Sequence, residues 1–167
     1  MAITVDSVVA TLSIVGGYSN AADLETIKAA LSITSNPTAY ANGTGNNQID
    51  LVHTDTITLS ATSQNYDLDA GTVTNGFGLA QTYAKVKLLY IRNKSTTSGQ
   101  TLTITGDFTA LATVGFAAGG LIIGAGGFLC LDNPLAGYAV TAGTGDVITV
   151  TNSVEFAYDI VILGTTV

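Results

Sequence analysis

The chain has 167 residues, a formal net charge of −7 and one cysteine; charged residues make up 10% of it and hydrophobic residues 47%. This length predicts one domain with a core of its own, and the negative charge opposes the phosphate neutralisation that nucleic-acid binding needs. DNA and RNA are therefore excluded as expected ligands. A surface with so little charge is typical of a protein that lies against copies of itself or against other partners.

Residues 1–48 are expected to form an N-terminal arm ahead of the main domain. Apolar residues occur over 3–16 without a clean period, which indicates an extended segment with one short strand. From Thr34 to Gln48 the chain is rich in Asn, Gly and Thr and contains Pro37, which is typical of a loop or linker.

A short helix is predicted near residues 21–31 of this arm. Asn20 can cap its start. Leu24, Ile27 and Leu31 recur at helical spacing. A helix of about three turns is marginal alone, so its apolar face needs a surface on the domain or on a partner. We therefore expect Leu24, Ile27 and Leu31 to take part in partner binding.

The compact domain is expected over residues 49–167. Its segments alternate apolar and polar residues, or carry β-branched and aromatic runs broken by Gly, Asn and Pro, as antiparallel strands do. The segments are 54–60, 64–69, 82–92 and 100–105, followed by four runs at 126–131, 137–141, 146–151 and 155–163. In 82–92 the alternation slips at Lys85 and Lys87, which predicts a strand that is covered on both faces in its second half or carries a bulge.

The strand pattern predicts an all-β fold. About eight strands, with turn signals roughly every eight to twelve residues, favour an antiparallel two-sheet sandwich of the jelly-roll type. An immunoglobulin-like sandwich is the alternative, although the paired cysteines and core tryptophan of its antibody version are absent.

Four of the five cationic residues lie close together, at Lys85, Lys87, Arg92 and Lys94. Such charges ordinarily keep the edge of a sheet soluble. The alternative is contact with an acidic partner, and Lys85 and Lys87 are the candidates for that contact.

No set of residues indicates catalysis, a cofactor or a metal. Cys130 lies between Leu129 and Leu131 and is interpreted as a small buried hydrophobe. His53, the only histidine, is interpreted as a surface or strand-end residue, because no second His or Cys accompanies it to bind zinc. Asp67 and Asp69 share one face of a strand, which leaves a weak calcium site open as an alternative.

The start of the chain, Met1 to Asp6, lacks the basic residues and apolar core of a signal peptide. The apolar runs are also much shorter than the roughly 20 residues needed to span a bilayer. We therefore expect a protein that is made in a cytoplasm and does not enter a membrane.

Four strand-and-turn segments resemble those of small virion structural proteins of tailed bacteriophages. They are 66–71, 84–93, 137–143 and 157–164, and the likeness covers roughly residues 50–165. The chain is most similar to jelly-roll capsid decoration, or cement, proteins. That resemblance implies a homo-oligomer, often a trimer, which binds the major capsid protein on the outside of the phage head. It implies location on the virion after synthesis in the bacterial cytoplasm, and no catalytic residues.

Three functional hypotheses follow. The first is a non-enzymatic capsid decoration protein, which accounts for the low charge and the Thr- and Gly-rich faces. The second is a host-binding or glycan-binding module of a head or tail fibre, although sugar sites favour aromatic platforms and the chain has no Trp. The third is a hydrolase, which would need two or three positioned titratable groups.

Overall fold

The computed structural model describes residues 5, 7–21, 26–34, 38–113 and 120–167. The chain is all-β, with 54% strand and 4% helix, as the sequence predicts. The expectation of about eight strands is not confirmed, because short pairs such as β8 (Val73–Thr74) and β9 (Ala80–Gln81) add to the longer strands. In the part of the chain that the structure describes, no helix is long and apolar enough to cross a membrane.

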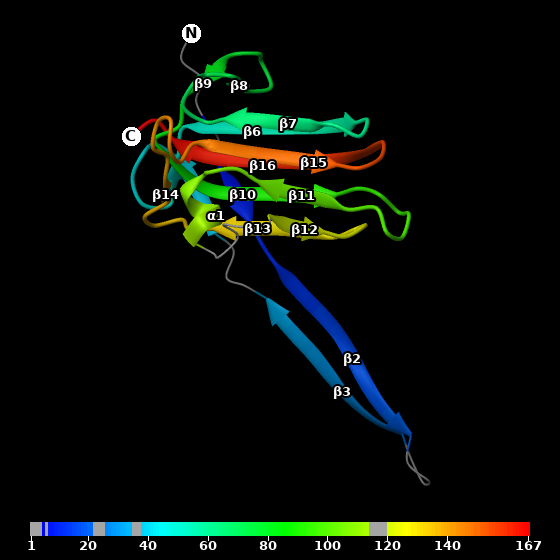
Figure 1. Ribbon diagram of the computed structural model, residues 1–167. Coiled ribbons are helices and arrows are strands. Elements are labelled where there is room, and N and C mark those ends of the chain that lie inside the picture. The colour runs from blue at the N-terminus through cyan, green and yellow to red at the C-terminus, as the bar shows by residue number, and fades with distance from the viewer. Residues whose placement is uncertain (1–4, 6, 22–25, 35–37, 114–119) are drawn as a thin grey trace.

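Two antiparallel sheets make up most of the molecule (Figure 1). The β16 sheet has the order β13 (Phe128–Asp132), β10 (Lys85–Asn93), β16 (Phe156–Thr165) and β6 (Leu51–Leu59), and β14 (Tyr138–Ala139) also pairs with β10. The β15 sheet has the order β12 (Leu121–Ile123), β11 (Leu102–Thr105), β15 (Val147–Asn152) and β7 (Ser63–Asp67). The chain crosses between the sheets at most connections, for example from β6 to β7 and from β15 to β16. A short helix, α1 (Thr109–Thr113), follows β11.

The two sheets enclose one hydrophobic core. Tyr158 and Ile160 from β16 and Ile148 from β15 are fully buried in it, as strand alternation predicts for one face of each sheet. The hydroxyls of Tyr66 on β7 and Tyr158 on β16 lie 2.6 Å apart across this core. Burial raises the pKa of both phenols, that of Tyr158 to about 12. One hydrogen bond between buried hydroxyls thus joins the two sheets.

A third layer partly covers the opposite face of the β16 sheet. This outer layer consists of β1 (Val8–Ala10), β4 (Thr38–Asn42) and β5 (Gln48–Ile49), in the order β1-β4-β5. Tyr40 of β4 and Ile49 of β5 pack with Leu88 and Leu163 of the sheet in a second buried cluster. Part of the expected N-terminal arm is therefore packed against the body, and the interpretation of 34–48 as a loop or linker is wrong over Thr38–Asn42, where burial of Tyr40 against the sheet stabilises a strand.

The strand β10 lies between these two cores. Leu88 belongs to the outer cluster, while its neighbour Leu89 belongs to the core between the sheets. The register with β16 shifts between Val86 and Leu88, so the strand has an irregularity at Lys87. The irregularity, one of the two alternatives that the slipped alternation predicts, is confirmed. Coverage of both faces is found at Val86 to Leu89 and not through the second half of the strand, where Tyr90 is half-buried and Arg92 is exposed.

A two-stranded ribbon extends away from the body (Figure 1). Its strands are β2 (Ser13–Ala21) and β3 (Thr26–Thr34), which pair antiparallel over nine residues. The helix expected near residues 21–31 is wrong at Ala21 and over 26–31, which are strand; residues 22–25, including Leu24, lie outside the described residues. An isolated helix of three turns is marginal, whereas pairing with β2 satisfies the backbone of β3.

Candidate functional site

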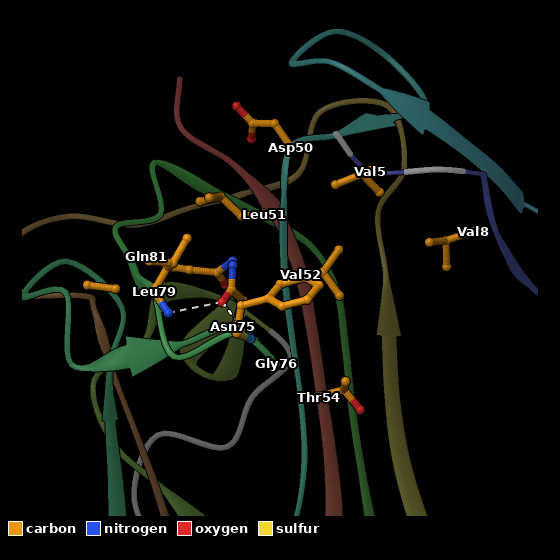
Figure 2. Close-up of a pocket in the computed structure, with 12 residues that line it drawn as sticks. Val5, Val8, Asp50, Leu51, Val52, Thr54, Asn75, Gly76, Leu79 and Gln81 are labelled. Atoms are coloured by element: carbon orange, nitrogen blue, oxygen red, sulfur yellow. Dashed lines mark hydrogen bonds between the residues drawn. The ribbon is translucent and has the colours of Figure 1, made fainter. Parts of the chain in front are cut away.

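An open pocket of about 440 Å³ lies beside β6, the end strand of the β16 sheet (Figure 2). We call it the β6 pocket. Its walls include Val5 from the N-terminal segment, Leu51 and Val52 from β6, and Phe77 and Leu79 from the connection between β8 and β9. In Figure 2, Val5 and Leu79 approach from opposite sides of Val52.

A hydrogen-bonded turn shapes one wall of this pocket. The Asn75 side-chain oxygen accepts the backbone N–H groups of Phe77 and Leu79, each at 3.0 Å. The backbone N–H of Asn75 also donates to the carbonyl of Leu79. An Asx turn of this kind fixes the loop without a packed core beneath it. The turn presents Phe77 to solvent, with 77% of its surface exposed.

Asp50, Asn75 and Gln81 in the lining of the β6 pocket make hydrogen bonds within the protein. The Asp50 carboxylate accepts hydrogen bonds from the Thr166 backbone N–H at 3.0 Å and from the Thr166 hydroxyl at 2.6 Å. The Gln81 side-chain oxygen accepts the hydroxyl of Tyr83 at 2.6 Å. What remains for a ligand is mainly apolar, so the pocket suits an aliphatic or aromatic group better than a polyol.

His53 lies on β6 and is buried, so the interpretation as a surface residue is wrong. It faces the core side of the sheet, where its ring contacts Tyr66 edge-on at 5.7 Å between centroids. Its Nδ1 lies 2.6 Å from the Thr74 carbonyl and must carry the proton to donate there. Nε2 is buried and has no hydrogen-bond partner among the described residues. The hydrogen bond from His53 to Thr74 thus connects β6 with β8.

A second concave surface occupies the outer face of the β16 sheet that the outer layer leaves open. This outer groove has a volume of about 670 Å³ and is lined by Val8 to Leu12 at one side. Its floor is formed by the side chains of Leu88, Tyr90, Phe128, Cys130, Val161 and Leu163. The rings of Tyr90 and Phe128 lie 5.8 Å apart, and Phe128 is half exposed. The floor is therefore an apolar surface that is open to solvent.

Cys130 is exposed in this groove, so the interpretation as a buried hydrophobe is wrong. Strand alternation turns Leu129 into the core and Cys130 to the opposite face. That face would be covered only if the outer layer reached this far. Partial desolvation raises the pKa of the Cys130 thiol, and the charge of Asp132 adds to the effect.

The structure separates the predicted partner-binding residues. Lys87 is only 2% exposed, and its Nζ donates to the Leu135 carbonyl at 2.6 Å. Burial lowers the pKa of Lys87, and the neighbouring charge of Lys85 adds to this. Ile27 and Leu31 lie on the ribbon, opposite Asn20 and Gly16 in the register. They therefore belong to a different part of the molecule from Lys85 and Lys87.

The aspartates considered for calcium act in a turn. The Asp67 side-chain oxygen accepts the backbone N–H groups of Asp69 at 3.2 Å and Ala70 at 2.9 Å. The described residues contain no group of three or more His, Cys, Asp or Glu side chains that could hold a metal ion.

Neither a scan against protein-family models nor searches of curated proteins and of solved structures found a match to this chain. The two concave surfaces are therefore the basis for a functional argument. The sequence analysis identified neither. The available signal for the β6 pocket was Phe77, an aromatic residue directly after Asn75 and Gly76, a pair of residues that is typical of turns.

Proposed function

We propose that this protein is a non-enzymatic virion structural protein that decorates and stabilises the outside of a phage head. In this role it binds the major capsid protein as a homo-oligomer, with a trimer favoured. It is made in the bacterial cytoplasm and then carried on the particle. The resemblance of segments 66–71, 84–93, 137–143 and 157–164 to cement proteins motivates this assignment.

The strand order supports a jelly roll as the architecture of the body. The two four-stranded paths are β13-β10-β16-β6 and β12-β11-β15-β7, so the first and last long strands of the body, β6 and β16, are neighbours. In the other sheet β7 and β15 are neighbours in the same nested way. Two sheets wound from nested strand pairs are the arrangement of jelly rolls, which are common in capsid proteins and lectins.

The observation that carries the function is the gathering of exposed apolar side chains at the two concave surfaces. Phe77 and Leu79 are exposed at the β6 pocket, and Phe128, Val9 and Leu12 are exposed at the outer groove. Contiguous apolar surface with a polar rim is typical of protein–protein contact. Two such surfaces on one small chain suit a protein that contacts both a lattice and its own copies.

The experiment is co-sedimentation with phage heads that lack this protein. Phe77→Ser is expected to weaken binding to the heads at least several-fold, because it removes an exposed aromatic anchor from the β6 pocket. Val154→Ser is the matched control: Val154 is also exposed, but it lies in the turn between β15 and β16. Full-length protein that fails to bind heads at micromolar concentration would overturn the proposal.

A glycan-binding module of a head or tail fibre is the second candidate. The observation in its favour is the exposed ring of Phe77 at the β6 pocket, since sugars stack on the faces of aromatic rings. Screening the protein against a glycan panel tests it. A glycan that binds the wild type and not Phe77→Ala, with no binding to heads by either form, would establish this alternative in place of decoration.

A further inference from the structure

The ribbon formed by β2 and β3 has one apolar face by register. Alternate residues of a strand share a face, and Tyr18 pairs with Ala29 while Ser19 pairs with Lys28. One face therefore carries the positions Ile14, Gly16, Tyr18, Asn20, Ile27, Ala29, Leu31 and Ile33, all apolar except Asn20. The other carries the positions Ser13, Val15, Gly17, Ser19, Ala21, Thr26, Lys28, Ala30, Ser32 and Thr34, of which six are polar. Such an amphipathic ribbon is expected to bury its first face against another surface.

The chain itself provides no such surface in the described structure. β2 and β3 pair only with each other in their sheet, and the ribbon extends away from the body (Figure 1). At its root, Ile14 is 50% exposed and Val15 is 73% exposed, although they point to opposite faces. Isolated two-stranded hairpins are marginally stable in water, so the ribbon needs a cover for its apolar face.

The outer groove is a second surface that the described residues leave open. Its floor is apolar, and Asp132 is the charged residue of its lining. The groove begins at Val8 to Leu12, directly before β2 starts at Ser13. Each copy thus carries one ribbon and one groove side by side, and its own ribbon leads out of its own groove.

We infer that the apolar face of the ribbon of one copy seats in the outer groove of a second copy. This rests on the homo-oligomer of the proposed function and does not depend on the capsid. Because each chain has one ribbon and one groove, the copies can form either a dimer in which each ribbon binds the groove of the other copy or a closed ring in which each ribbon binds the groove of the next copy. The groove is then completed by the partner copy.

The area is sufficient for a stable contact. A strand of nine residues spans roughly 30 Å, and a two-stranded ribbon is about 10 Å wide, so one face covers roughly 300 Å². Counting both partners, each seated ribbon buries about 600 Å². A reciprocal pair therefore buries about 1,200 Å², which lies at the lower end of specific protein interfaces.

The single native cysteine makes a direct test possible, because Cys130 lies in the groove. One full-length chain carries Ala29→Cys together with Cys130→Ser, and the other is the wild type lengthened by a tag. After mixing and mild oxidation, we expect a disulfide-linked species with the summed mass of the two chains. Ser19→Cys with Cys130→Ser is the matched control on the opposite face of the ribbon, and it should give several-fold less of that species.

Equal yields from Ala29→Cys and Ser19→Cys would overturn the inference. So would a cross-link found only within one chain when Ala29→Cys is made in the presence of native Cys130, since the ribbon would then fold back on its own groove. Circular dichroism of each variant verifies that its strand content is retained.

A second measurement needs no new cysteine. Leu31→Asp places a charge on the apolar face of the ribbon, and Ser32→Asp places the same charge on the other face. We expect Leu31→Asp to increase the rate at which a bulky maleimide labels Cys130 several-fold, with Ser32→Asp close to the wild type. Identical rates in all three proteins would overturn the inference. If light scattering shows an oligomer but the ribbon cross-link does not form, this inference is overturned and the proposed function is unaffected. If the ribbon cross-link forms but the protein does not bind phage heads, the capsid role is overturned and the interface between copies is supported.

Discussion

The body and the ribbon use the same backbone pairing to different effect. β6 pairs with β16 over nine residues, and β2 pairs with β3 over nine residues. On β16, Tyr158, Ile160 and Ile162 are fully buried, whereas Ile14 and Val15 of β2 are both exposed. Inter-strand hydrogen bonds replace bonds to water and contribute little net stability, while burial of apolar surface contributes most of it. Pairing thus defines the shape of both regions, and in the body the burial of apolar side chains between the sheets adds a core.

The outer layer is intermediate between them. β1 and β4 belong to the same expected arm as the ribbon, yet Tyr40 of β4 is fully buried against Leu88 and Leu163. Residues 1–48 therefore divide into a packed layer and a ribbon. The domain boundary at 48/49 stays a prediction, because β4 lies before it and packs on the strands that follow it.

The largest effect is expected from removing the packed part of the arm. A chain that starts at Ile49 loses Tyr40 and uncovers Leu88 and Leu163, which should lower the free energy of unfolding by about 3–5 kcal/mol or more. As a control, residues 13–34 are replaced by a short Gly-Ser linker, which can close because Ala10 pairs with Thr38. This deletion should change the urea midpoint very little. Equal losses in both would show that the ribbon supports the body.

Within the body, Gly164→Ala should lower the free energy of unfolding by about 3 kcal/mol, because overpacking against fixed backbone is costly. A Cβ at Gly164 would collide with the carbonyl oxygen of Lys85 and lie 2.5 Å from the ring of Tyr83. Gly124→Ala is the control, since its Cβ would meet nothing within 4 Å. Urea unfolding of both variants measures the difference, and similar midpoints would contradict the packing described here.

A smaller effect should appear at high pH. Burial raises the pKa of Tyr158 from 10.0 to about 12, so above pH 10 the unfolded chain loses this proton before the folded one does. The contribution is fully present below pH 10 and is lost as the pH rises to about 12, on the order of 2 kcal/mol. Urea unfolding across this range should show a shallower decline for Tyr158→Phe. If the free energy of unfolding of Tyr158→Phe declines with pH as steeply as that of the wild type, ionisation of Tyr158 does not cause the loss of stability.

The smallest effect is expected in the ribbon. Ile27→Ala should change the free energy of unfolding of the body by less than about 0.5 kcal/mol, whereas the same truncation at Ile160 should cost about 2–4 kcal/mol. The comparison is made at low protein concentration, where contacts between copies contribute least. A cost at Ile27 as large as that at Ile160 would show that the ribbon packs within its own chain.

The sequence by itself determined the fold class and much of the body. Alternation over 54–60 and 64–69 placed β6 and β7, and the slip at Lys85 and Lys87 predicted the irregularity in β10 as one of two alternatives. These features are encoded locally, because the two-residue period of a strand sets which side chains share a face. Local periodicity was therefore sufficient to predict an all-β chain.

The tertiary structure decided what covers each face. Leu24, Ile27 and Leu31 fit helical spacing, but the described part of that segment pairs with β2 as a strand. Residue spacing within the segment cannot predict this pairing, because it depends on a strand elsewhere in the chain. Cys130 and His53 were assigned to the wrong environments for a related reason. Strand periodicity predicts that Cys130 and Leu129 lie on opposite faces of the sheet. Whether the face that carries Cys130 is buried depends on how far the outer layer extends over it, which is decided by the packing of segments distant in sequence.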